Sequence, residues 1–210
     1  MTATSAFWDK IADKYAATPI KNQASYDYTL NRTKHYLGKD DTVLELGCGT
    51  GSTALELAGL VPHIAATDIS AGMLQKAQTK LDASQISNVA FAQADTAGSP
   101  TGPFDVVMAF NLLHLVPDLD RALADIAKRV RPGGYFISKT FCMPERVNAM
   151  SLMITFALPL MQAFGKAPQL TKFKAAELDR AITRAGFSLI ETGQGPTKDP
   201  RRFLVARRDG

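Results

Sequence analysis

The stretch Val43-Leu44-Glu45-Leu46-Gly47-Cys48-Gly49-Thr50-Gly51 decides how this chain folds. Its short apolar run enters three glycines at alternate positions, and a helix-compatible run from Ser52 to Leu60 follows. This order predicts a strand, a tight turn and a helix. Glycines suit such a turn because a Cβ would block both a positive φ and the approach of a ligand to the backbone N–H groups. We therefore expect a small ligand to bind at this turn.

Several nucleotide-binding folds use G-x-G spacings, and the residues around the turn narrow the choice. Ser52 stands where a dinucleotide fingerprint would place its third glycine. Asp68 closes the next apolar run, His63 to Asp68, where an acidic side chain can accept hydrogen bonds from ribose hydroxyls. A nicotinamide-dependent oxidoreductase stays a rival hypothesis, but we recognise no residues for hydride transfer.

Three more predicted strands follow in order. Val89 to Asp95 forms the third, Phe104 to Asn111 the fourth, and Pro132-Gly133-Gly134 leads into the fifth, Tyr135 to Phe141. With the glycine turn, this series resembles the class I S-adenosylmethionine-dependent methyltransferases. The resemblance covers roughly Phe7 to Arg208. It is closest to the small-molecule branch that includes the ubiquinone/menaquinone-biosynthesis methyltransferases, the methyltransferase type 11 family.

The resemblance implies a doubly wound α/β fold with a seven-stranded, mostly parallel Rossmann-like sheet and an antiparallel last strand. A single domain over residues 1–210 is expected, with a helical lid at 1–38 and a helical cap insertion at 142–174. The last two predicted strands, Phe187 to Thr192 and Arg202 to Ala206, would form a hairpin at the sheet edge. Arginines 201, 202, 207 and 208 would then be solvated charges that protect the edge strand.

The resemblance also implies which side chains bind S-adenosylmethionine and its product S-adenosylhomocysteine. Asp68 would take the ribose hydroxyls, Asp95 the adenine amine, and Ile69 one adenine face. Tyr15 would lie near the methionine end, unless it only packs the lid, and Met73 is either nearby or part of its helix core. The expected cofactor-binding residues are Tyr15, Glu45, Gly47, Cys48, Gly49, Gly51, Asp68, Ile69, Met73, Asp95, Thr96 and Asn111.

Asn111 and His114 are the expected catalytic residues, because the fourth strand delivers them to the carboxyl edge of the sheet near the transferred methyl group. A neutral imidazole can accept a proton from a hydroxyl substrate during methyl transfer. The alternative is that His114, between Leu113 and Leu115, is a hydrogen-bonded core residue. We expect no metal, since no H-E-x-x-H, paired-cysteine or calcium-loop motif is evident.

The segment from Ser151 to Phe164 is rich in Met, Leu and Phe, contains Pro159, and is longer than a plain connection between strands requires. We expect it to cap the substrate side, which implies a small-molecule acceptor with apolar surface. The alternatives are a homodimer interface, core packing, or peripheral membrane contact together with the basic tail 198–210.

Composition bounds the remaining possibilities. The chain has 210 residues and a formal net charge of +4, and its last residues, 198–210, hold five Lys or Arg against two Asp. We therefore expect no nucleic-acid partner. Two cysteines without a C-x-x-C pair, no signal-peptide pattern and no long apolar run predict a cytoplasmic protein. A cofactor-binding regulatory protein without turnover is an alternative that the sequence leaves open.

Overall fold

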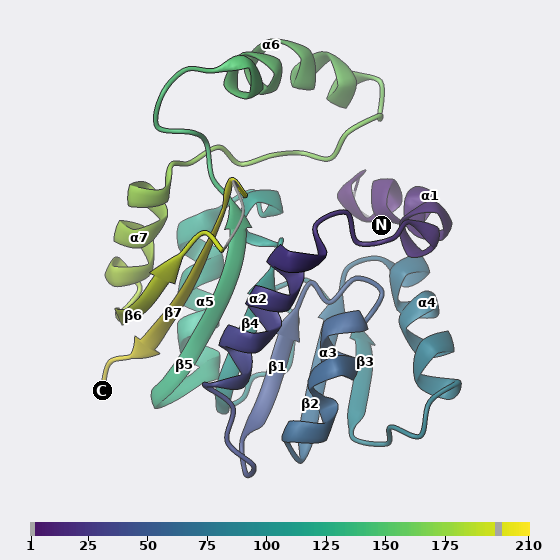
Figure 1. Cartoon of the computed structure of the whole chain (residues 1–210), viewed down its shortest axis with the longest axis vertical. Helices are drawn as coiled ribbons and strands as arrows, with labels where there is room; N and C mark the ends of the chain where they lie inside the picture. The colour runs from purple at the N-terminus through teal and green to yellow at the C-terminus, as the bar shows by residue number, and fades with distance from the viewer. Residues whose placement is uncertain (1–2, 196–198) are drawn as a thin grey trace.

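A twisted sheet with helices on both faces forms the body of the molecule (Figure 1). The computed structural model describes residues 3–195 and 199–210. Within them, seven strands pair in the order β3-β2-β1-β4-β5-β7-β6. Strands β1 to β5 pair in parallel, and β7 is antiparallel to both β5 and β6. The strands are β1 Thr42–Leu46, β2 His63–Asp68, β3 Val89–Gln93, β4 Phe104–Phe110, β5 Val130–Phe141, β6 Phe187–Gly193 and β7 Arg201–Arg208. The predicted fold is confirmed.

Alternate residues of the central strands supply two hydrophobic layers. Val43 packs with α2 and α3 on one face, whereas Leu44 packs with α5 and α7 on the other. Such strands are apolar on both sides because helices cover both faces. The helices described are α1 Ala3–Ala17, α2 Gln23–Lys34, α3 Ser52–Leu57, α4 Ala71–Asp82, α5 Leu119–Arg129, α6 Ala149–Ala163 and α7 Ala175–Arg184, with short 3-10 turns at Ala58–Leu60 and Leu113–Leu115. None of these helices is long and apolar enough to cross a membrane.

Strands β3 and β5 have boundaries that differ from the sequence prediction for a clear reason, while β4, β6 and β7 differ by only one or two residues at their ends. Strand β3 ends at Gln93 because the chain turns there, and the Asp95 carboxylate accepts a hydrogen bond from the Gly98 N–H at 2.7 Å. Strand β5 begins at Val130 and runs through the Pro-Gly-Gly sequence, with a register shift against β4. Gly134 permits this, because a Cβ there would lie 2.7 Å from the Asp105 carbonyl oxygen.

The expected role of the four arginines at an exposed edge was wrong, because β7 lies between β5 and β6 and the edge strand is β6. The arginines instead bind neighbouring elements. Arg202 pairs with Asp179 of α7, and Arg208 Nη1 donates to the Gly186 carbonyl at 2.7 Å. Lys198, which we counted in the basic tail, lies outside the described residues.

Helices α1 and α6 lie beyond the carboxyl ends of the parallel strands (Figure 1). Asp9 of α1 accepts hydrogen bonds from the Ser70 hydroxyl at 2.6 Å and the Gly72 N–H at 2.9 Å, which fixes α1 to the start of α4. Helix α2 buries Leu30 and Thr33 against the sheet face. Of the predicted lid, therefore, α1 covers the carboxyl edge while α2 covers a face.

Candidate active site

A cavity of about 1750 Å³ lies at the carboxyl ends of the parallel strands, beneath α1. All the predicted site residues except Gly51 line it. Gly51 instead begins α3 with a φ of 73°, and a Cβ there would lie 2.6 Å from the Phe91 ring. The structure thus brings residues from α1, the glycine turn and the ends of β2, β3 and β4 to one open space, as an α/β ligand crevice requires.

The glycine turn connects β1 to α3, is hydrogen-bonded to the end of β2 and leaves room for a ligand. Gly47 and Gly49 have φ values of 66° and 54°, which side chains rarely adopt. A Cβ at Gly49 would meet no atom within 4 Å, so the space over this residue is open. The Gly49 N–H donates to Asp68 Oδ2 at 2.8 Å. The turn is therefore both fixed and accessible.

Asp68 lies beside the turn and uses each carboxylate oxygen once. Oδ2 binds Gly49, and Oδ1 accepts from the Ser70 N–H at 2.9 Å. Burial raises the pKa of Asp68, and these backbone N–H groups oppose the rise. Each carboxylate oxygen retains a further lone pair. The side chain is thus oriented and still able to accept a ligand hydroxyl.

Glu45 is a buried acid with one side-chain oxygen that accepts no hydrogen bond from the described residues. Its side chain is only 2% exposed, and Oε2 has no hydrogen-bond partner among the described residues. Burial, reinforced by the negative charge of Asp68, raises the pKa of Glu45 to about 8, against a hydrogen bond from the Ala54 N–H. An unpartnered buried oxygen is costly unless a ligand or water satisfies it. Glu45 lines the cavity, so it is placed to meet a cationic or hydrogen-bond-donating ligand.

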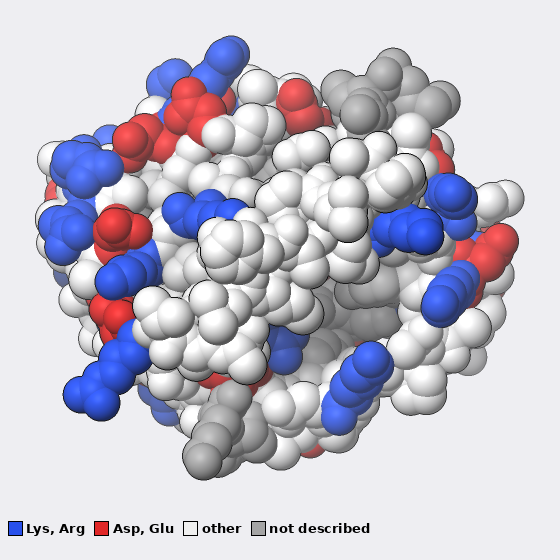
Figure 2. Space-filling view, turned by 90° about the horizontal axis from the view of Figure 1, so that it is seen from above, with Lys and Arg blue, Asp and Glu red and all other residues white. Residues whose placement is uncertain are grey.

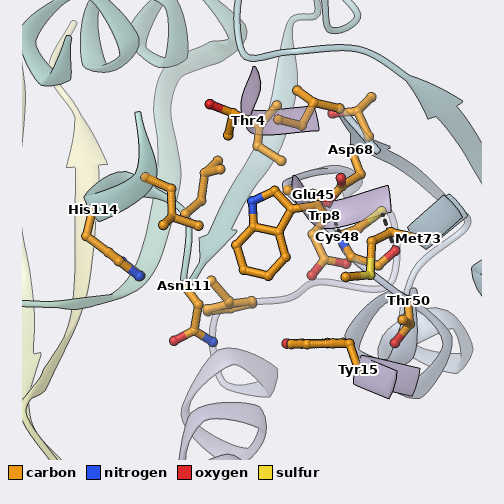
Figure 3. A pocket seen from close by; sticks show the side chains of 18 of the residues that line it. Thr4, Trp8, Tyr15, Glu45, Cys48, Thr50, Asp68, Met73, Asn111 and His114 are labelled. Carbon is orange, nitrogen blue, oxygen red and sulfur yellow. Dashed lines mark hydrogen bonds between the residues drawn. The ribbon is translucent and has the colours of Figure 1, made fainter. Parts of the chain in front are cut away.

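His114 and Asn111 lie together on the other side of the cavity (Figure 3). The His114 N–H donates to Thr140 Oγ1 at 3.2 Å, and that hydroxyl lies 2.8 Å from His114 Nδ1. The Phe141 N–H also donates to Nδ1, at 3.4 Å. A backbone N–H can only donate, so the Phe141 contact makes Nδ1 an acceptor and places the proton of the neutral ring on Nε2. Burial, with a smaller effect of the Arg201 charge, lowers the pKa of His114 to about 4.

Asn111 follows β4 in a strained conformation. Its φ of 56° makes it the one non-glycine residue with a positive φ in the described part of the chain. Its N–H donates to the Lys139 carbonyl at 2.6 Å, which fixes the turn against β5. Such strain concentrates at functional sites, where it aims a side chain.

The residues predicted to bind adenine occupy the end of the cavity near β2 and β3. Asp95 is exposed there, and Thr96 and Ile69 line the same wall. Met73 is 2% exposed yet also contributes to the cavity lining, so it serves the helix core and the wall together. Cys48 is a free thiol whose pKa is raised well above its usual value, chiefly by burial. It therefore remains protonated at neutral pH.

Trp8 is a cavity residue that our sequence analysis missed. Its indole lies among Glu45, Cys48 and Asn111, and its ring meets that of Tyr15 edge to face at 6.2 Å (Figure 3). Tyr15 is 50% exposed, so it does not pack a closed core. The signal was present in the sequence, since Trp8 and Tyr15 are two helical turns apart and share a face of α1.

Comparison with known proteins decides the family. A family model described as a methyltransferase domain matches residues 37–184. The chain belongs to the methyltransferase-domain family. An uncharacterized methyltransferase of Mycobacterium bovis is 36% identical to this domain over 108 residues, which are 51% of this chain and 54% of that protein. Malonyl-[acyl-carrier protein] O-methyltransferase of a Paenibacillus species is 26% identical over 188 residues, 83% of this chain and 67% of that protein.

The methyltransferase domain spans about half the length of the first curated relatives that it matches. Among solved structures, the DhpI–SAH complex has a TM-score of 0.76 at 22% identity, covering 99% of this chain and 96% of that one. The predicted methyltransferase family is thus confirmed, and S-adenosylmethionine remains the predicted cofactor. The residues of the cavity fit this cofactor. Its cationic ammonium group suits the unpartnered oxygen of Glu45, its ribose hydroxyls suit the Asp68 carboxylate, and the open space over Gly49 leaves room for it.

Proposed function

We propose that this chain transfers the methyl group of S-adenosylmethionine to a small acceptor that has apolar surface. The observation that supports it best is that two acids lie beside an open glycine turn: Glu45, a buried acid with one oxygen that has no partner among the described residues, and Asp68, an oriented one. A nicotinamide dinucleotide would use the second acid but offers no aliphatic ammonium group for the first. Parallel titration of the protein with S-adenosylmethionine, S-adenosylhomocysteine and NAD is the test.

Different side chains would bind different parts of the cofactor. Glu45 would bind the ammonium group of its methionine part, Asp68 the ribose hydroxyls, and Asp95 the adenine amine. The open space over Gly49 would admit the ligand to the turn, and Trp8 and Tyr15 would cover it from α1. Charge-assisted hydrogen bonds to buried carboxylates are the strongest of these contacts.

When bound, the cofactor supplies an electrophilic methyl group, because its sulfur is positively charged. The chain then has to align the acceptor and exclude bulk water. Asn111 is fixed by its backbone for this role, and the half-buried His114 ring offers an Nε2–H donor. We had expected His114 to accept a proton, but Thr140 and Phe141 occupy Nδ1 and disfavour the tautomer with a bare Nε2. We therefore propose that His114 orients the oxygen of the acceptor through a hydrogen bond from Nε2–H.

Replacing His114 tests this assignment. His114→Ala should leave the affinity for S-adenosylhomocysteine unchanged and slow methyl transfer to an oxygen acceptor about tenfold, the effect of one lost hydrogen bond. Because the pKa of His114 is about 4, the ring is neutral above pH 5.5, and wild-type kcat should show no His114 titration from there to pH 8. Initial rates across this range measure both effects. Equal rates for the two proteins would show that His114 is a structural core residue with no part in methyl transfer.

Helix α6 carries the most exposed apolar surface of the described residues. Phe156 is 74% and Leu160 63% exposed, whereas Ile154 alone in this helix is buried. Figure 2 shows this side of the molecule, where uncharged side chains fill the centre and Lys and Arg surround them. Gly165 and Lys166, which follow α6, line the main cavity. We propose that α6 caps the apolar part of the acceptor there.

The α6 surface can be tested by making it polar. The double variant Phe156→Ser, Leu160→Ser should keep S-adenosylhomocysteine affinity and lower kcat/KM at least about tenfold for apolar phenol or quinol acceptors. The bound acceptor would bury both side chains, and fully burying one such side chain contributes about 1.5–3 kcal/mol. Ile190→Ser, on β6 and 51% exposed, is the matched control. Unchanged kcat/KM would contradict the cap. A shift to monomer in sedimentation would then indicate a homodimer interface, and lost vesicle binding would indicate membrane contact.

The remaining alternatives make different predictions. A regulatory protein without turnover would bind S-adenosylmethionine but methylate no acceptor, and an oxidoreductase would bind NAD. We propose a cytoplasmic location because Cys48 and Cys142 are both free and lie on separate elements. A localisation experiment with a fluorescent fusion would show a different compartment if this is wrong.

A further inference from the structure

Positive charge gathers at the acceptor end of the cavity, on the side of β5 and β7. Lys139 of β5 and Arg201 of β7 both line the cavity. Asp199 lies between them and forms ion pairs with both, at 3.2 Å to Lys139 Nζ and 2.7 Å to Arg201 Nε. Two cations therefore share one carboxylate, and the cluster keeps a net charge of +1 beside the cavity.

Lys139 is fully engaged inside this cluster. Its ammonium group donates to the Ser25 carbonyl at 3.0 Å and to Thr29 Oγ1 at 3.0 Å, besides its pair with Asp199. The side chain is only 5% exposed. Lys139 thus fixes Asp199 and ties α2 to the sheet, but it has no donor left for a ligand.

Arg201 is the member of the cluster that remains available. Its Nε and backbone N–H both bind Asp199, and its Nη1 lies 3.4 Å from Asn111 Oδ1. Its Nη2 has no hydrogen-bond partner among residues 3–195 and 199–210, and the side chain is 34% exposed. The positive charge also contributes to the low pKa of His114. The guanidinium group therefore faces the two residues that we place beside the acceptor.

We propose that Arg201 binds an anionic group, a carboxylate in the first instance, on the methyl acceptor. Its planar group can form parallel hydrogen bonds to a carboxylate, and Asp199 holds it in place from behind. Together with the apolar α6, this makes the acceptor class an amphipathic acid. The inference rests on the proposed function, since it names the acceptor of that same site.

The position of Arg201 favours the acceptor over the carboxylate of the cofactor. The residues that fit the cofactor lie at the ends of β1, β2 and β3, whereas Arg201 pairs with Phe141 across β5 and β7. Strand β7 is separated from β1 by both β4 and β5. The experiment nevertheless has an arm for each source of the carboxylate.

The test uses the full chain saturated with S-adenosylhomocysteine and a pair of probes that differ in charge, 4-butylbenzoate and 4-butylbenzamide. Isothermal titration of wild type should show the benzoate binding at least about tenfold more tightly than the amide, as a charge-assisted hydrogen bond predicts. Arg201→Gln should remove this preference, and Arg201→Lys should keep part of it. Arg207→Gln, at the other end of β7, is the matched control and should behave as wild type.

Three outcomes would overturn the inference. They are equal binding of the two probes to wild type, no binding of the benzoate, or an unchanged preference in a folded Arg201→Gln variant. If that variant instead loses affinity for S-adenosylhomocysteine and keeps the preference, Arg201 holds the carboxylate of the cofactor. Failure of wild type to bind S-adenosylhomocysteine would overturn the proposed function itself, which the first titration of the series reveals.

Discussion

Replacing Asp68 by alanine should weaken the binding of S-adenosylhomocysteine by at least about tenfold, because charge-assisted hydrogen bonds to ribose hydroxyls contribute about 1.5–3 kcal/mol. The loss of binding free energy should exceed the contribution of the ribose hydrogen bonds alone. Asp68 also accepts hydrogen bonds from the N–H groups of Gly49 and Ser70, so its removal should loosen the turn that we propose as the ligand contact. Isothermal titration measures the change. Fluorescence of Trp8, the single tryptophan of the chain, gives an independent signal from within the cavity.

Two variants separate the ribose contact from loss of structure. Asp68→Asn keeps the shape of the side chain and an acceptor oxygen, so it should bind more tightly than the alanine variant and less tightly than wild type. Asp82→Ala, at the exposed end of α4, is the matched control and should bind as wild type does. Wild-type affinity in a folded Asp68→Ala protein would show that the ribose lies elsewhere.

Replacing Glu45 by glutamine should have the second large effect, and it should act on binding and stability in opposite directions. The variant loses the negative charge that faces the ammonium group, so affinity for S-adenosylhomocysteine should fall at least about tenfold. Free protein should become more stable at alkaline pH, because glutamine removes a buried acid whose Oε2 has no partner. Glu56→Gln, exposed on α3, is the matched control.

The sign of the pH effect follows from the raised pKa. Glu45 has a pKa of about 8 in the fold, against an ordinary value of 4.5, so the folded protein binds more protons between these values. Its contribution to the free energy of unfolding is full below pH 4.5 and is lost as the pH rises to about 8. Glu45→Gln should abolish this slope in urea titrations.

Cofactor binding should also release a proton. At pH 7 the free protein holds Glu45 mostly protonated, whereas a cationic ligand stabilises the carboxylate. Titrations in buffers of different ionisation enthalpy should therefore report proton release by wild type and none by Glu45→Gln. Proton uptake, or equal release by both proteins, would contradict the assignment of Glu45 to the ammonium group.

The strands and the glycine turn were predictable because their signals are local. Alternating glycines follow an apolar run too short for a helix, and Ser70 caps α4 as its position predicts, accepting from the Met73 N–H. The position of β7 was not predictable from local pattern. A hairpin and an inserted strand have the same alternation of residues, and only pairing with β5 places β7 inside the sheet.

The candidate site was predictable where residues follow strand ends and unpredictable where distant elements meet. Glu45, Asp68 and Asn111 come directly from β1, β2 and β4, so their convergence follows from a parallel sheet. Trp8 enters through the docking of α1 on α4, which depends on Asp9. Arg201 faces the cavity only because β7 is antiparallel to β5 and starts at its carboxyl end. The helical spacing of Trp8 and Tyr15 is visible in the sequence, but the docking of α1 and the pairing of β7 that bring Trp8 and Arg201 to the cavity are tertiary features that the sequence does not show.

The central claim is that the cavity binds S-adenosylmethionine and its product, and titration of wild-type protein tests it directly. S-adenosylmethionine, S-adenosylhomocysteine and NAD should be titrated in parallel at pH 7, with heat and Trp8 fluorescence as readouts. We expect micromolar binding of the first two and none of NAD. Binding of NAD alone would contradict the account, because Glu45 and the glycine turn would then serve a different nucleotide and every role assigned to the cavity would have to be reassigned.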